Sequence, residues 1–165
     1  MSDQPPVLHM LCGKIASGKS TLSQQLAAAP KTVRIVEDDW LAALFAEEMQ
    51  TPRDFMRCSA KLRGAMAPHI VALLKAGMSV VLDFQANTPE ARAWMRALFE
   101  EAGAAHALHL LTAPDALCLE RLKARNAGGD HPFEATEAQF HQVTKYFQPP
   151  SPEEDFTVIR HDPPA

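Results

Sequence analysis

The sequence predicts an α/β fold with a parallel sheet of five strands and helices on both of its faces. Short apolar segments alternate with helical segments along all 165 residues, and no repeat or interdomain linker interrupts them. Such alternation is typical of parallel sheets whose strands are joined by right-handed helical crossovers. Hydrophobic residues make up 47% and charged residues 22% of the chain, which is the composition of a globular protein. We therefore expect one domain that spans residues 1–165.

Five short runs of apolar or β-branched residues predict the strands, and the segment SVVLDF is the clearest of them. Ligands of parallel α/β sheets bind at the carboxyl ends of the strands, so the residues that follow each run are candidates for function. The expected strands are Val7–Cys12, Thr32–Glu37, Ser79–Phe84, His106–Thr112 and Phe156–His161.

Start and stop signals predict six helices. Threonine followed by proline at 51–52 and at 88–89 pairs an N-cap residue with a proline at the first helical position. Thr136 and Gln139 have the spacing of a capping box. The expected helices cover residues 19–29, 40–49, 52–76, 89–103, 114–127 and 136–147.

A phosphate-binding motif lies between the first strand and the first helix. The segment GKIASGKS matches the pattern GxxxxGK[ST] in full. Its glycines let the backbone wrap around a phosphate, and its amides and the helix N-terminus supply positive potential. Lys19 is expected to reach the β- and γ-phosphates, and the Ser20 hydroxyl to ligate Mg²⁺. The expected nucleotide-binding residues are Gly13, Lys14, Ile15, Ala16, Ser17, Gly18, Lys19, Ser20 and Thr21.

The motif narrows the fold to the three-layer sandwich of the P-loop NTPases. Ala16 stands where many kinases have a further glycine, so we expect a stiffer loop at this residue. No NKxD motif follows the later strands, which argues against a GTPase, and the chain is short for a transporter-type ATPase. The small size favours a nucleotide-dependent kinase.

Carboxylates follow the second and third expected strands. In a P-loop sheet the end of the second strand lies near the γ-phosphate, where a carboxylate can orient an acceptor hydroxyl and take its proton. We expect Asp38 to act as this base and Asp39 to be the N-cap of the next helix. Asp83 ends the third apolar strand and is expected to hold Mg²⁺ together with Ser20.

Two arginines precede a glycine-rich segment. Arg121 and Arg125 are four residues apart and therefore share one face of a helix. We expect both to act in catalysis by closing over the transferring phosphoryl group, together with a mobile lid at about 126–136. Arg92 is a weaker candidate for this role, and Arg63 is expected to be a solvated charge on the long helix.

Charge and cysteine content exclude several classes of protein. The net charge of −4 argues against a general nucleic-acid-binding protein, which needs a basic surface. No two cysteines have CxxC spacing, so we expect three buried, reduced thiols rather than a zinc site or disulfides. His106 and His109 are expected to be structural or solvated. No apolar run reaches membrane-spanning length and the polar start does not read as a signal peptide, so we expect a cytoplasmic protein without membrane contacts.

The chain resembles the branch of P-loop kinases that includes chloramphenicol phosphotransferase, the zeta-toxin kinases and phage polynucleotide kinase. The resemblance is carried by the phosphate motif and by the segments VEDDW, VVLDFQANTPEAR and LERLKARN. It implies that Asp38 is the acceptor base, that Asp83 is the strand-three aspartate, and that Arg125 is the arginine before the lid. Polynucleotide kinase has an arginine three residues after the base, whereas this chain has Leu41.

These observations predict an ATP- and Mg²⁺-dependent phosphotransferase that moves the γ-phosphoryl group to a hydroxyl of a small molecule. Leu41 and the acidic net charge make a nucleic-acid acceptor the less favoured alternative, so a polynucleotide or nucleoside kinase stands second. A further alternative is an ATP-binding or ATPase regulatory module without a small-molecule acceptor.

Overall fold

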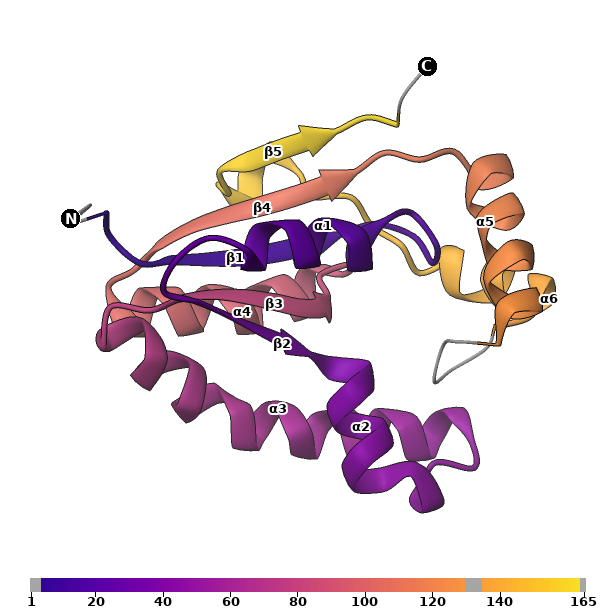
Figure 1. Cartoon of the computed structure of the whole chain (residues 1–165), viewed down its shortest axis with the longest axis horizontal. Coiled ribbons are helices and arrows are strands. Elements are labelled where there is room, and N and C mark those ends of the chain that lie inside the picture. The colour runs from indigo at the N-terminus through magenta and orange to yellow at the C-terminus, as the bar shows by residue number, and fades with distance from the viewer. Residues whose placement is uncertain (1–3, 130–134, 164–165) are drawn as a thin grey trace.

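A five-stranded parallel sheet forms the centre of the molecule in the computed structural model, which describes residues 4–129 and 135–163 (Figure 1). The strand order is β2-β3-β1-β4-β5, and every neighbouring pair is parallel. The predicted fold class is therefore confirmed, as is the number of strands within the described residues. The strands are β1 (Val7–Cys12), β2 (Thr32–Val36), β3 (Ser79–Gln85), β4 (Ala105–Leu111) and β5 (Val158–His161).

Helices cover both faces of the sheet. Helix α1 lies on one face, where it contacts β2 and β3, and α3 and α4 lie on the other (Figure 1). Short 3₁₀ segments cover Ala46–Glu48 and Pro152–Glu154. The helices are α1 (Lys19–Ala27), α2 (Glu37–Phe45), α3 (Pro52–Lys75), α4 (Pro89–Ala102), α5 (Asp115–Gly128) and α6 (Glu137–Thr144).

The predicted helix caps are present. The Thr51 and Thr88 side chains accept hydrogen bonds from backbone amides in the first turns of α3 and α4. Thr136 and Gln139 form the reciprocal capping box of α6. Gly103 ends α4 with a φ of 66°, a left-handed conformation that glycine adopts without steric cost. These caps satisfy amide and carbonyl groups that a helix end leaves unpaired.

The main core lies between the sheet and the two helices α3 and α4. It includes Leu8, Met10, Val80 and Leu82 from the central strands, all of which are fully buried. The three cysteines are also buried and unpaired, as predicted. Within the described residues, no helix combines the length and apolar character that crossing a bilayer requires.

The start of α2 differs from the prediction. Strand β2 ends at Val36, which is the N-cap of α2 in an extended conformation, and the helix begins at Glu37. Asp39 is therefore not an N-cap, and that prediction is wrong: it is an exposed residue of the first turn, next to Asp38. Three acidic residues in this turn complement the positive N-terminal end of the helix dipole, which replaces the missing cap hydrogen bond.

Arg92 anchors the segment that leads to β5. It is fully buried, and its guanidinium donates to both carboxylate oxygens of Glu154 at 2.8 and 3.2 Å. It also donates to the carbonyls of Ala86 and Gln148 at 2.9 and 2.8 Å. The candidacy of Arg92 as a lid arginine is therefore wrong, because the side chain joins α4 to the connection between α6 and β5.

Three histidines form a row of hydrogen bonds across β1, β4 and β5. The His109 ring lies 3.0 Å from Nδ1 of His9 and 2.8 Å from Nε2 of His161. Burial lowers the pKa of His109 to about 4, with the neighbouring imidazoles acting in the same direction. His106 stacks on Phe99 with ring centroids 4.2 Å apart. The structural role expected for His106 and His109 is thus confirmed.

Candidate active site

The phosphate-binding loop joins the end of β1 to the start of α1. A Cβ atom at Gly13 would lie 2.5 Å from Oγ of Ser17, so any side chain there would force Ser17 to move. Gly18 has a φ of 106°, which side-chain-bearing residues rarely adopt. Ala16 has a φ of 60°, a left-handed conformation that is costly for alanine. The loop therefore has the shape that its glycines predict, with local backbone strain where it lacks one.

Lys19 lies at the mouth of this loop. Its ammonium group donates to the carbonyls of Gly13 and Lys14 at 2.5 and 2.8 Å. Burial lowers the pKa of Lys19 to about 8, while Asp83 and, more weakly, Asp38 act to raise it. The Lys19 ammonium group is therefore buried among backbone oxygens, and the nearby carboxylates offset only part of the cost of burying its charge. An incoming phosphate would stabilise the charged form of Lys19.

Two side chains outside the motif fix its first residues. The Asn87 side chain accepts from the Gly13 amide and donates to the Gly13 carbonyl, both at 2.9 Å. The Lys14 ammonium pairs with Asp115 of α5 at 2.5 Å. Ile15 to Thr21 line the cleft, whereas Gly13 and Lys14 do not. The Asn87 amide therefore clamps the phosphate loop to the segment after β3.

Ser20 and Asp83, the two residues predicted to hold Mg²⁺, both line the cleft. Oδ2 of Asp83 accepts from the Ser23 hydroxyl at 2.8 Å and pairs with Arg34 at 3.4 Å. The described residues contain no group of three or more acidic, histidine or cysteine ligands that could hold a metal on its own. A hydroxyl and one carboxylate fit Mg²⁺, which is usually held by one or two protein oxygens together with water and phosphate.

The first turn of α2 brings two carboxylates to the cleft. Asp38 is half-buried and lines it. Glu37 is 5% exposed, and its carboxylate accepts from the Ser59 hydroxyl at 2.8 Å and from Nε of Arg63 at 3.3 Å. Arg63 is therefore a half-buried ion-pair partner and not the solvated charge expected from the sequence. In the sequence, Glu37 stands out only as one of three consecutive acidic residues. The fold shows that it is the buried one.

The two predicted arginines of α5 line the same cleft as Lys19 and Asp38. One guanidinium nitrogen of Arg121 donates to the carbonyl of Ser17 at 3.2 Å. Nε of Arg125 is buried without a hydrogen-bond partner among the described residues. Burial lowers the pKa of Arg125 and the charge of Asp38 raises it. The predicted lid at 126–136 includes 130–134, which lie outside the described residues.

One cleft of about 1540 Å³ at the carboxyl edge of the sheet is lined by Lys19, Ser20, Asp38, Asp83, Arg121 and Arg125. Pockets that hold one small ligand usually measure about 300–1,000 Å³, so this cleft has room for two. One part lies beside His161, Asp162 and Pro163 after β5, and another lies beside α2, α3 and α6. In Figure 1 the loop between β1 and α1, which carries the phosphate motif, lies between the end of β5 and α2.

A known family model covers most of the sequence. An AAA domain model matches residues 8–150. The chain belongs to the AAA domain family. The matched residues include the phosphate loop, the carboxylates Asp38 and Asp83, and the arginines Arg121 and Arg125. No curated protein sequence matches the chain.

Solved structures of P-loop kinases share the fold. A candidate kinase from Chloroflexus aurantiacus is 22% identical with a TM-score of 0.76, and the match covers 96% of this chain and 86% of that one. The APS kinase of Mycobacterium tuberculosis, solved with AMPPNP and APS, is 20% identical with a TM-score of 0.63, over 97% and 90% of the two chains. This AAA domain therefore shares the fold of these kinases.

An RNA repair assembly is a third neighbour. A chain of the Pnkp1/Rnl/Hen1 complex is 20% identical with a TM-score of 0.67, and the match covers 87% of this chain but 44% of that one. The shared part is the fold. Leu41, which stands where polynucleotide kinase has an arginine, is fully buried here and does not line the cleft.

Proposed function

We propose that this AAA domain is an ATP-dependent kinase that transfers the γ-phosphoryl group to a hydroxyl of a small molecule. The observation that supports this most strongly is the meeting of the phosphate loop, two arginines and Asp38 in one cleft. A phosphate loop alone serves many NTPases, whereas a carboxylate facing the phosphate end is what an acceptor hydroxyl needs. We further propose that residues 1–165 act as a single domain.

The electrostatics give the bound nucleotide a direction. In this motif the lysine contacts the β- and γ-phosphates of the nucleotide. The charge of Asp38 raises the pKa of both Lys19 and Arg125, so Asp38 lies on the same side of the cleft as these two cations. The γ-phosphate would therefore point toward α2. The nucleoside would extend to the opposite part of the cleft, beside His161 and Asp162. The acceptor would then occupy the part between α2, α3 and α6.

Asp38 would act mainly by orienting the acceptor. An ordinary aspartate is too weak a base to ionise an alcohol in advance, but the hydroxyl proton leaves late in a loose phosphoryl-transfer transition state. A carboxylate that accepts this proton contributes about 10²–10⁴-fold to the rate. Mg²⁺, held by Ser20 and Asp83, would neutralise charge that develops on the β- and γ-phosphate oxygens.

Arg121 and Arg125 would bind the transferring group from the side of α5. Arg121 already contacts the loop carbonyl of Ser17. The buried, unpartnered Nε of Arg125 is a donor that phosphate oxygens could satisfy. A planar guanidinium can bind phosphate through two parallel hydrogen bonds, which an ammonium group cannot do.

Acceptor-dependent formation of ADP tests this proposal. The protein would be incubated with Mg·ATP and a library of small alcohols, and products would be identified by mass. Asp38→Asn should lower kcat by about 10²-fold or more while ATP binding stays near normal. Asp39→Asn is the matched control, because Asp39 is the exposed neighbour on the same turn, and it should keep full activity. Equal losses in both variants would contradict the assignment of Asp38.

Because one structural neighbour belongs to an RNA repair complex, the screen should also include a nucleic-acid acceptor. An oligonucleotide with a free 5′-hydroxyl should be offered beside the small alcohols. We expect little transfer to it, because Leu41 replaces the arginine expected of polynucleotide kinase, is fully buried and does not line the cleft. Efficient transfer to the oligonucleotide would replace the small-molecule acceptor in the proposal.

A further inference from the structure

Exposed apolar side chains gather on the acceptor part of the cleft. Phe55 and Met56 at the start of α3 are 38% and 72% exposed, and both line the cleft. Val143 and Tyr146, at and just after the end of α6, are 42% and 65% exposed and line it as well. Large apolar groups that face solvent around a concave site usually mark a binding surface. We call these four residues the apolar rim.

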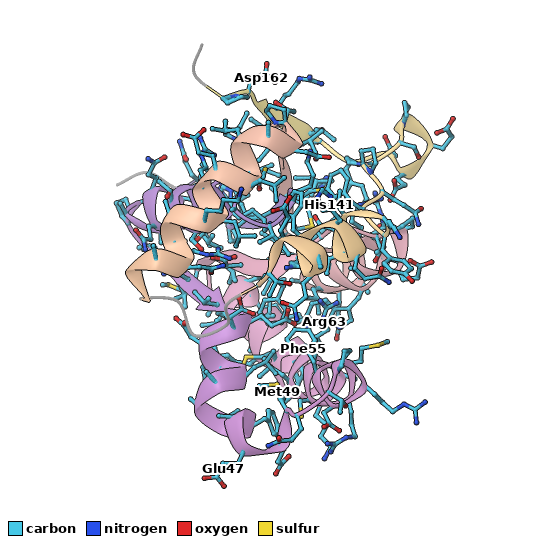
Figure 2. All side chains as sticks on the ribbon, turned by 90° about the vertical axis from the view of Figure 1, so that its right-hand side faces the viewer. Glu47, Met49, Phe55, Arg63, His141 and Asp162 are labelled. Atoms are coloured by element: carbon cyan, nitrogen blue, oxygen red, sulfur yellow. The ribbon has the colours of Figure 1, made fainter. Side chains whose placement is uncertain are left out.

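The apolar rim is continuous with the segment that follows β3. The amide of Gln148 donates to the carbonyl of Asn87 at 2.8 Å, so the end of α6 lies against the β3–α4 connection. Phe55 and Thr88 line both the main cleft and a smaller pocket of about 360 Å³ beside it. Phe55 and Arg63 both line this smaller pocket, and Figure 2, which looks at this end of the molecule, labels both below α6 in that view.

Charges on this side of the cleft are mostly negative. Glu37 and Asp38 line the main cleft, and Glu90 lines the smaller pocket. Among the described residues, Arg63 is the only lysine or arginine that lines the smaller pocket, and it pairs with Glu37. Its guanidinium also lies over the rings of Phe84 and Trp94, with centroids 5.6 and 5.1 Å away. Arg63 is thus already neutralised and stacked.

The other lysines and arginines lie at the nucleotide site or outside both pockets. The remaining cations that line the main cleft within the described residues are Lys19 and Arg121, which belong to the phosphate loop or contact it, and Arg125, to which the proposed function assigns the transferring phosphate. Arg53 and Arg57 of α3 line neither pocket. The sequences of 1–3, 130–134 and 164–165 contain no lysine or arginine. A carboxylate, sulfate or phosphate on the acceptor would therefore meet like charges and find no unpaired cation outside the nucleotide site.

We propose that the acceptor is an alcohol that carries no anionic group and presents an apolar, preferably aromatic, portion to Phe55, Met56, Val143 and Tyr146. A positive charge on the acceptor is tolerated or favoured by Asp38 in the main cleft and Glu90 in the smaller pocket. This inference rests on the proposed kinase function and specifies its substrate class. It excludes nucleotides, phosphosugars, sugar acids and 5′-hydroxyl nucleic acids as preferred acceptors.

Three aryl alcohols of similar size test this proposal. They are para-hydroxymethyl benzylamine, para-benzenedimethanol and para-hydroxymethyl benzoate, which carry positive, zero and negative charge. Binding to the protein with Mg·AMPPNP would be measured by saturation-transfer NMR and calorimetry, and acceptor-dependent ADP formation would be measured with Mg·ATP. We expect the amine and the diol to bind at least about tenfold more tightly than the benzoate, which corresponds to about 1.4 kcal/mol.

A charge introduced into the apolar rim provides the matched variant. Met56→Lys should strengthen binding of the benzoate relative to the amine by about tenfold. Val158→Lys is its control, because Val158 is a 43% exposed apolar residue on β5 that lines neither pocket, and it should leave the ratio unchanged. Both positions are exposed, so neither change should prevent folding. Tyr146→Ser should weaken all three alcohols.

The two readouts separate this inference from the kinase function. The expected binding order without any ADP formation would overturn the kinase function and keep the ligand class. ADP formation that is as efficient with the benzoate as with the diol would overturn the ligand class and keep the kinase function. Failure of all three alcohols to bind at the highest concentration at which they dissolve would also overturn the ligand class.

Discussion

Arg92 offers the sharpest test of how the site is supported. Replacing it with methionine keeps an unbranched side chain in the core but removes four hydrogen bonds to Ala86, Gln148 and Glu154. Two carbonyls would lose a charged donor, which costs about 1–3 kcal/mol for each buried group left unpaired. Glu154 is 21% exposed at its side chain, so water would partly compensate its lost partner.

These contributions give an expected loss of about 3–4 kcal/mol in the free energy of unfolding, at the lower end of the range for breaking a buried ion pair. Domains of this size are stable by only about 5–15 kcal/mol, so the variant should still fold but unfold at a much lower urea concentration. Arg160→Met is the matched control, because the Arg160 side chain is 67% exposed and pairs with the equally exposed Asp162. It should change stability by about 0.5 kcal/mol or less.

The pH dependence adds a second readout for the same pair. Hydrogen bonding from Arg92 holds the pKa of Glu154 below its usual value of 4.5. A depressed carboxylate pKa contributes stability above the unfolded-state pKa, and this contribution is lost as the pH falls through the folded-state pKa. The difference between wild type and Arg92→Met should therefore shrink below about pH 4.5. A loss under about 1 kcal/mol near neutral pH would refute the anchoring role.

Three further outcomes are expected. Ala16→Gly should raise the free energy of unfolding by about 1 kcal/mol in urea titrations without nucleotide, because it relieves the left-handed φ of 60°; a destabilised variant would contradict the strain. The wild-type free energy of unfolding should fall as the pH drops from 6.5 toward 4, because the pKa of His109 is lowered in the folded state. His109→Gln should flatten this slope, and an unchanged slope would assign it to other groups. Mg·ATP affinity, measured by calorimetry, should weaken above about pH 8, where Lys19 loses its proton; constant affinity up to about pH 9.5 would place the phosphates away from Lys19.

Local signals were sufficient for most of the fold. Apolar periodicity predicts all five strands, and threonine caps predict the starts of α3, α4 and α6, because both features depend on residues close in sequence. The start of α2 was misjudged at Asp39 because the preceding strand continues directly into the helix and leaves no room for a separate cap. Strand order comes from long-range pairing, and the sequence contains no local signal for it.

The site also combines residues that local motifs predict with residues whose roles depend on long-range contacts. The full phosphate motif predicts Lys19 and Ser20 at the cleft, and both line it. The contributions of Glu37, Asn87 and Arg92 depend on partners far along the chain, at separations of 22 to 74 residues. Pattern analysis can identify such residues as polar and well placed, but their pairing follows only from the packing of α3 and the β3–α4 connection.

Direct transfer of the γ-phosphoryl group is the measurement that tests the central claim most closely. Protein in excess over γ-labelled Mg·ATP would be mixed with a pool of small alcohols, and the label would be followed in a single turnover for wild type, Asp38→Asn and Asp39→Asn. The account predicts that wild type and Asp39→Asn move the label to an organic product and that Asp38→Asn does so at least about 10²-fold more slowly. Label that appears only as inorganic phosphate, at the same rate in all three proteins, would contradict it.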